Sequence, residues 1–197
     1  FNFKTAEEVA NAIKMAKQKK AKGIIVDLRN NPGGLLDACV DVTSQFVPKG
    51  VVVGMKGRYD KANETLYVKE GMANKLPLVV LVNEGSASAS EIFAGAIKDH
   101  KRGTIIGTKT FGKGSVQTLF NLPDKSGIYV TIARYHTPSG YVIDKKGLQP
   151  DIKIAGEPTK NKKNDKQLQK AISVLKKNDK QLQKTISVLK EKIRKKK

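Results

Sequence analysis

The sequence predicts an α/β fold in which βαβ units build a mainly parallel sheet. Short apolar runs rich in β-branched residues alternate along the chain with segments of helical periodicity. Ile24–Leu28 and Leu78–Val82 have the composition of buried strands, and each is followed by a glycine-containing turn and then a helical pattern. Strand, turn, helix and strand in that order is typical of a parallel sheet with helices on its faces.

The remaining elements follow from the same patterns. Residues 115–120 alternate in polarity like a half-buried strand, and Pro77 prevents a helix from running into Leu78–Val82. In chain order, we expect helices beginning at 5, 35 and 89, strands at 24–28, 51–53, 78–82, 104–106, 115–120 and 128–133, and an extended segment at 148–154.

Length and composition indicate a globular protein with one core. The chain has 197 residues, enough for a domain of ordinary size, and no apolar run approaches the length of a transmembrane segment. It opens without a charged and apolar leader, so no signal peptide is expected in it. Cys39 is the only cysteine, which excludes an internal disulfide, and we expect it to pack as a small hydrophobe.

The net charge of +20 is concentrated in the last part of the chain. Residues 157–197 hold 15 of the 38 Lys and Arg but only 4 of the 18 Asp and Glu. No zinc finger, RNA-binding aromatic motif or Gly-x-x-Gly clamp accompanies this charge. We therefore divide the chain into a core of residues 1–156 and a solvated basic tail of residues 157–197, and we expect no nucleic-acid partner.

The tail contains a duplicated unit. Asn164–Lys176 recurs as Asn178–Lys190, with Ala171 replaced by Thr185. Leucines fall seven residues apart through both copies, which favours a coiled coil and self-association. Asp179 interrupts that seam, and asparagine can cap a helix at the start of each copy. We interpret the tail as two short helices that either self-associate or pack back on the core.

The turn between Leu78–Val82 and the following helix holds the strongest candidate for a reactive residue. A sharp strand-to-helix turn is where hydrolases present a serine nucleophile, and Ser88 stands at the start of the helix. Ser88 and Glu91 also have the Ser-x-x-Glu spacing of a capping box, so a purely structural role fits the same residues.

A second glycine-rich segment resembles a phosphate-binding loop without completing one. Gly107, Gly112 and Lys113 match Gly-x-x-x-x-Gly-Lys, but Gly114 stands where a hydroxyl should hold Mg²⁺. An alternating strand pattern follows where a helix should begin. We therefore expect neither a nucleotide cofactor nor a metal ion.

Three motifs together resemble those of the C-terminal processing, or tail-specific, serine peptidases. They are Asp27-Leu-Arg-Asn-Asn-Pro-Gly-Gly34, Gly85-Ser-Ala-Ser-Ala-Ser-Glu91 and Thr110-Phe-Gly-Lys-Gly-Ser-Val-Gln117, in that order, and the resemblance runs from about Thr5 to Ile154. It implies a ClpP/crotonase-like core and cleavage of polypeptides near nonpolar carboxyl termini. It also implies that Ser88 is the nucleophile, Lys113 the general base and Gln117 the residue that orients the lysine.

The resemblance further implies an oxyanion hole and sets a condition on the base. A backbone N–H of Gly33 or Gly34 would join that of Ala89 to hold the developing negative charge. A free lysine has a pKa of about 10.4, so Lys113 must be withdrawn from water to accept a proton. Phe111 and Val116 are expected to supply apolar walls for it. His136 is an alternative candidate for the base. His100 is excluded, because it lies too far from Ser88 along the helix that Ser88 begins.

Members of this family carry an N-terminal helical region and a PDZ domain, which the resemblance does not cover here. Bacterial members work on the outer side of the cytoplasmic membrane, so an extracytoplasmic location is implied. The leading hypothesis is a Ser/Lys endopeptidase core acting on polypeptides. The alternative is a noncatalytic relic or an assembly module that acts through its basic helical tail.

Overall fold

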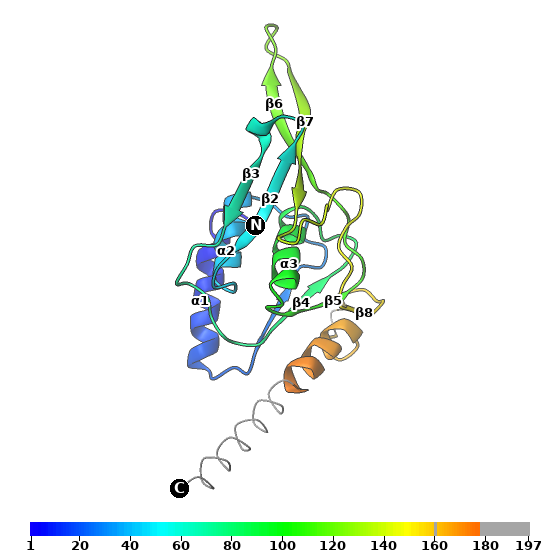
Figure 1. Cartoon of the computed structure of the whole chain (residues 1–197). Coiled ribbons are helices and arrows are strands. Elements are labelled where there is room, and N and C mark those ends of the chain that lie inside the picture. The colour runs from blue at the N-terminus through cyan, green and yellow to red at the C-terminus, as the bar shows by residue number, and fades with distance from the viewer. Residues whose placement is uncertain (160, 178–197) are drawn as a thin grey trace.

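The computed structural model describes residues 1–159 and 161–177, and it contains the predicted parallel sheet (Figure 1). The four strands of this sheet are all parallel and follow the order β1-β4-β5-β8. Their bounds are β1 Ile24–Asp27, β4 Leu78–Val82, β5 Thr104–Gly107 and β8 Ile152–Lys153. The prediction of an α/β fold with a parallel sheet is therefore confirmed.

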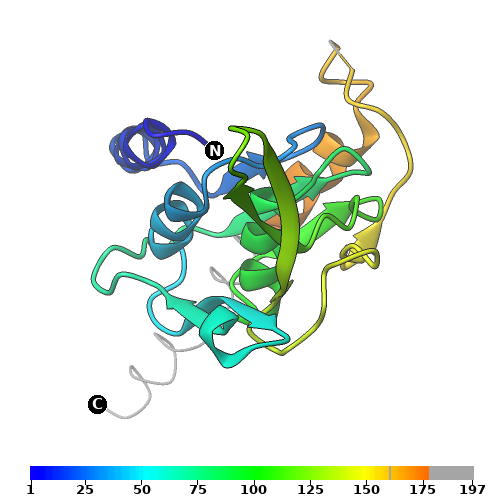
Figure 2. The same ribbon diagram turned by 90° about the horizontal axis from the view of Figure 1, so that it is seen from above.

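The prediction that the sheet is mainly parallel is only half right, because four further strands form a separate antiparallel sheet. Its order is β3-β2-β7-β6, with β2 at Val51–Gly57, β3 at Glu64–Tyr67, β6 at Ser115–Asn121 and β7 at Gly127–His136. Five residues join β6 to β7, too few for the crossover that parallel strands need. The β6–β7 hairpin projects from the body of the molecule, and Figure 2 looks along it onto the rest of the chain (Figures 1 and 2).

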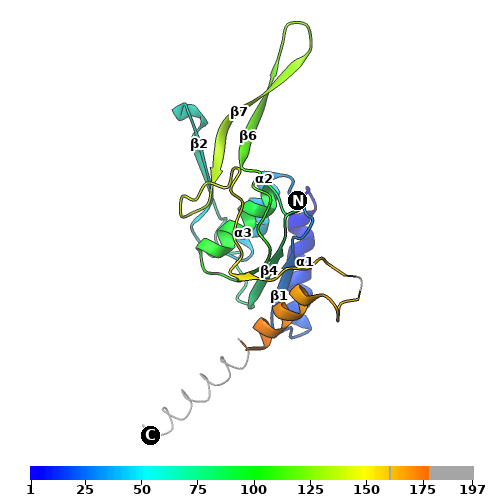
Figure 3. The ribbon, with the colours of Figure 1, turned by 90° about the vertical axis from the view of Figure 1, so that its right-hand side faces the viewer.

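Helices cover both faces of the parallel sheet. One face carries α1 (Thr5–Gln18), α2 (Leu36–Ser44) and α3 (Ala89–Asp99), and the other carries a helix over residues 166–177 (Figure 3). All five residues of β4 are buried because alternate side chains enter different layers. Leu78, Val80 and Val82 pack with α2 and α3, whereas Val79 and Leu81 pack under the 166–177 helix.

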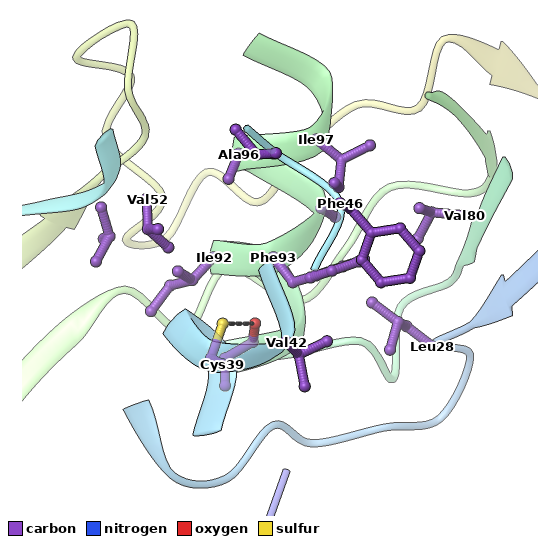
Figure 4. Packing of buried hydrophobic residues seen from close by; sticks show 14 of the residues in the cluster. Leu28, Cys39, Val42, Phe46, Val52, Val80, Ile92, Phe93, Ala96 and Ile97 are labelled. Carbon is purple, nitrogen blue, oxygen red and sulfur yellow. Dashed lines mark hydrogen bonds between the residues drawn. The ribbon is translucent and has the colours of Figure 1, made fainter. Parts of the chain in front are cut away.

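The core between the sheet, α2 and α3 contains Cys39 and an aromatic pair. Phe46 and Phe93 meet edge to face with ring centroids 5.7 Å apart (Figure 4). Cys39 is fully buried, and its thiol donates a hydrogen bond to the carbonyl oxygen of Ala89 over 3.2 Å. Burial raises the pKa of this thiol to about 12. The prediction that Cys39 packs as a small hydrophobe is confirmed.

The first copy of the duplicated unit forms the 166–177 helix, which Asp165 rather than Asn164 caps. The backbone N–H of Leu168 donates to the Asp165 carboxylate over 2.9 Å. The Asp165 carboxylate also forms an ion pair with Arg29 on the core, and this second partner favours Asp165 over Asn164 as the cap. The second copy and its proposed cap at Asn178 lie outside the described residues. Within the described part of the chain, no helix has the length and apolar character needed to cross a membrane.

Candidate active site

The turn between β4 and α3 is held by buried side chains that leave one serine accessible. Ser86 and Ser90 are both fully buried. The Ser86 hydroxyl donates to the carbonyl of Leu28 over 2.7 Å, and the Ser90 hydroxyl donates to the carbonyl of Asn31 over 3.0 Å. Ser88 is half-buried, so it is the serine of this motif that reaches the surface.

Ser88 also has a backbone conformation that L-residues rarely adopt. Its φ is 55° and its ψ is −120°, and it stands directly before the first residue of α3. Such strain persists only where the surroundings impose it. Here β4 ends and α3 begins within a few residues, and the intervening turn is bonded to the loop that follows β1. The geometry is that of a sharp strand-to-helix elbow.

Glu91 connects this elbow to the loop that carries Lys113. The Glu91 side chain is fully buried. One carboxylate oxygen accepts hydrogen bonds from the backbone N–H groups of Ser88 at 3.1 Å and Lys113 at 2.8 Å. The other accepts from the Thr110 hydroxyl and from the N–H of Gly112. Ser88 and Lys113 are therefore brought together through a single oxygen atom.

Sequence reasoning assigned Glu91 only the capping role. The Ser-x-x-Glu spacing correctly pairs Glu91 with Ser88, and the carboxylate does accept the Ser88 N–H. Its bonds to Thr110, Gly112 and Lys113 depend on how distant segments fold together. The glycines on either side of Lys113 gave no signal for these bonds, because the backbone that they allow to come close is that of residues 143–147.

The side chains of Lys113 and Gln117 are exposed, which contradicts the expected burial of the lysine. Phe111, expected to wall off the amine, has 67% of its surface exposed. The cause is the hairpin: β6 begins at Ser115 and leaves the body of the molecule, so solvent reaches the residues at its base. Among the described residues, no hydrogen bond joins the side chains of Ser88, Lys113 and Gln117.

The Arg29–Gly34 loop lies against the elbow. Gly33 has φ 101°, and a Cβ there would lie 2.7 Å from the carbonyl oxygen of Ala87 and 2.8 Å from the nitrogen of Ala89. The N–H of Gly33 donates to the Asn31 side chain over 2.9 Å. Within the described part of the chain, the N–H groups of Gly34 and Ala89 have no hydrogen-bond acceptor. The two glycines therefore differ: the N–H of Gly33 is already used in a hydrogen bond, and that of Gly34 is available for one.

The two histidines lie in other surroundings. His100 caps the far end of α3, and its Nε2 lies 2.7 Å from the carbonyl oxygen of Val51. His136 ends β7, where its Nδ1 lies 2.9 Å from the carbonyl oxygen of Arg134. His136 lines a basic concavity formed mainly by β2, β7 and residues 142–146, and the lining does not include Ser88. Among the described residues, no group of three or more His, Cys, Asp and Glu side chains is placed to hold a metal ion.

Comparison with known proteins assigns the chain to a family. Residues 1–154 match Peptidase family S41. The matched residues include both sheets, the elbow and the Lys113 loop. The chain belongs to Peptidase family S41. The resemblance to C-terminal processing peptidases predicted from the three motifs is thereby confirmed. The family match ends before the duplicated unit, which begins at Asn164.

Two relatives at 46% identity are named as processing proteases. The chain is 46% identical over 151 residues to a carboxyl-terminal-processing protease of Synechocystis, and 46% identical over 159 residues to a carboxy-terminal-processing protease of Bartonella bacilliformis. These matches cover 77% and 78% of the chain but only 35% and 37% of the relatives. A solved photosystem II D1 C-terminal processing protease superposes with a TM-score of 0.73 at 42% identity, covering 78% of this chain and 40% of that one.

Proposed function

We propose that the chain is the catalytic core of a serine endopeptidase of the carboxyl-terminal-processing type, using a Ser88/Lys113 dyad. The observation that carries the proposal is the shared Glu91 carboxylate, which holds the backbones of both residues. A structural cap alone would not require Glu91 to bind the Lys113 loop. The names of the 46%-identical relatives support the reaction class.

The proposed reaction proceeds through an acyl-enzyme. Ser88 Oγ attacks the carbonyl carbon of the scissile peptide bond while its proton passes to Lys113 Nζ. When the tetrahedral intermediate collapses, the C–N bond breaks and Lys113 returns that proton to the departing amine. Water then hydrolyses the Ser88 ester, with Lys113 again taking and returning a proton. Gln117, four residues after Lys113 and within β6, would orient the lysine amine through its amide oxygen.

The oxyanion would be held by Ala89 and Gly34. The Ala89 N–H stands at the first position of α3, where helix N–H groups lack intrahelical acceptors and favour negative charge. Gly34 is preferred to Gly33 because the Gly33 N–H already donates to Asn31. Gly33 instead keeps the loop close to the elbow, since it has no side chain between the two backbones.

A bound substrate would supply the desolvation that Lys113 needs. The amine is exposed in the chain by itself. A polypeptide lying across Ser88 would cover this region and exclude water from it, which favours the neutral amine that can accept a proton. The proposal therefore makes the base competent in the complex with substrate.

Further assignments rest on the resemblance and on the relatives. We infer a ClpP/crotonase-like peptidase core over residues 1–156 and a basic helical tail over residues 157–197. The substrates would be polypeptides cleaved near nonpolar carboxyl termini, on the outer side of a bacterial cytoplasmic membrane. The chain spans about a third of the length of its curated relatives, so these assignments concern the function of a core.

Cleavage of an unstructured peptide that ends in apolar residues tests the proposal. The chain should cleave it, and Ser88→Ala should reduce the rate by about 10³-fold or more, because the nucleophile is lost. Ser126→Ala is the control for loss of a serine hydroxyl elsewhere, because Ser126 is exposed in the turn between β6 and β7. Equal rates for the chain and Ser88→Ala would exclude Ser88 as nucleophile. No cleavage by either would favour a noncatalytic assembly module.

A further inference from the structure

The outer face of the parallel sheet is covered by the first copy of the duplicated unit, and we call the surface under that helix the groove. Val79, Leu81 and Ile106 form its floor and are fully buried. Ala171 of the 166–177 helix is also fully buried against them, and Leu168, Val174 and Leu175 pack at the edges. A Cβ on Gly23 would lie only 2.7 Å from Leu175 Cδ2, so the glycine leaves room for that leucine.

A polar anchor orients the helix in this groove. Arg29 Nη1 donates to Asp165 and to the Gln167 side-chain oxygen, each over 3.0 Å, and the side chains of Arg29 and Asp165 are each only 4% exposed. The Gln167 amide donates in turn to the carbonyl oxygen of Ile154 over 2.8 Å. Burial alone would raise the pKa of Asp165, but hydrogen bonds from Arg29 and the Leu168 N–H lower it. The groove therefore recognises a carboxylate just before the helix and an amide in its first turn.

Every one of these contacting side chains but one recurs fourteen residues later. The matched positions in the second copy are Asp179, Gln181, Leu182, Val188 and Leu189. The exception is Thr185, which replaces Ala171, the residue packed directly on the sheet. The second copy thus carries the other contacting residues unchanged and has two extra heavy atoms where Ala171 is fully buried.

We propose that the groove is a docking site for the 14-residue unit as such, and that Asn178–Lys190 of the same chain exchanges with the first copy in it. The two copies dock one at a time because both require Arg29 and the same apolar floor. This exchange is independent of the proposed peptidase activity. It defines the peptide that the surface fits: Asp-x-Gln-Leu-x-x-small-x-x-Val-Leu.

Two effects favour the first copy. Ten residues, 154–163, link β8 to the first copy, whereas 24 residues, 154–177, would link it to the second. Loop-closure entropy makes the longer connection about fourfold less favourable. Thr185 adds volume and a hydroxyl where Ala171 has no exposed surface, which costs about tenfold. The first copy should therefore occupy the groove in all but a few per cent of molecules.

Hydrogen exchange of the full chain followed by mass spectrometry tests the exchange. The copies give peptides of different mass because Ala171 and Thr185 differ. In the unmodified chain, amides of 166–177 should be more protected than those of 180–191. The triple variant Asp165→Ala, Ala171→Thr and Thr185→Ala removes the anchor of the first copy and relieves the second. We expect the order of protection to reverse.

A matched control and three outcomes make the test decisive. Asp179→Ala alters only the second copy and should leave the pattern of the unmodified chain. The proposal is overturned if 180–191 gains no protection in the triple variant. Loss of protection in β4 of that variant would overturn it too, because the second copy would have failed to replace the first. Protection of both copies at a doubled mass in solution would place the second copy on another molecule, contrary to exchange within one chain.

Discussion

Glu91 is a buried carboxylate whose hydrogen-bonding capacity is fully used by two segments of the site. Four donors, three of them backbone N–H groups, point at its two oxygens. A charged acceptor strengthens each of these bonds, and an unpaired buried donor costs about 1–3 kcal/mol. The position of the Lys113 loop relative to Ser88 therefore depends on the two acceptor oxygens of one residue.

Replacing Glu91 by glutamine should loosen the site while keeping its size. The amide has only one acceptor oxygen, so the donors facing the other atom lose their acceptor and meet an NH₂ group. We expect unfolding to become easier by about 2–4 kcal/mol in urea and the cleavage rate to fall mainly in kcat. Glu84→Gln is the control, because Glu84 is an exposed carboxylate in the same turn. An unchanged urea midpoint and an unchanged kcat would refute this role.

A second prediction at the residue scale concerns the ability of Lys113 to accept the proton of Ser88. Lys113→Arg should be nearly inactive, because guanidinium keeps its proton under all usable conditions and cannot act as a base. Lys113→Ala should be equally impaired, and Gln117→Ala less so, because it orients the base without replacing it. Peptide cleavage measures all three. Full activity of Lys113→Arg would mean that a positive charge or another residue, such as His136, performs the step.

At the scale of elements, local patterns predicted the β4–α3 unit but not its partners. An apolar run, a turn and a helical periodicity are adjacent in sequence, so the strand, the elbow and the Ser88–Glu91 pairing could all be inferred. The contact between Glu91 and Thr110 requires separate segments to meet, and no local signal encodes it. The burial of Lys113 was predicted wrongly for a related reason: the alternation in Ser115–Phe120 indicates a strand but not that its hairpin leaves the core.

The contact between the Arg29–Gly34 loop and α3 depends on a glycine. Gly33→Ala should destabilise the fold and reduce cleavage, because its φ of 101° strains any other residue and its Cβ would strike the backbone at Ala87 and Ala89. Strain alone costs about 1–3 kcal/mol. Gly71→Ala isolates that strain, since Gly71 has φ 82° but nothing within 4 Å of an added Cβ. Equal losses of stability in the two variants would show that the loop moves away from an added Cβ at no further cost in the free energy of unfolding.

At the scale of the whole molecule, the parallel sheet needs a cover on each face. Three helices of the family-matched region cover one face, and the 166–177 helix covers the other. The sequence left open whether the duplicated tail packs on the core or associates with another chain, because leucine spacing fits both. The described first copy packs on the core. The distribution of charge divides the chain at residue 156. The packing does not, because the helix that follows this boundary covers a sheet that precedes it.

Truncation measures how much the sheet depends on this cover. A chain ending at Lys177 keeps the docked helix and should unfold at nearly the same urea concentration as the full chain. A chain ending at Gly156 exposes Val79, Leu81 and Ile106 and leaves Arg29 with Asp27 as its remaining carboxylate partner. Breaking the buried Arg29–Asp165 pair alone should cost about 3–5 kcal/mol, and exposing the apolar face should favour aggregation. If the chain ending at Gly156 had the same urea midpoint as the full chain, the 166–177 helix would contribute nothing to stability. The parallel sheet would then be stable with one face exposed.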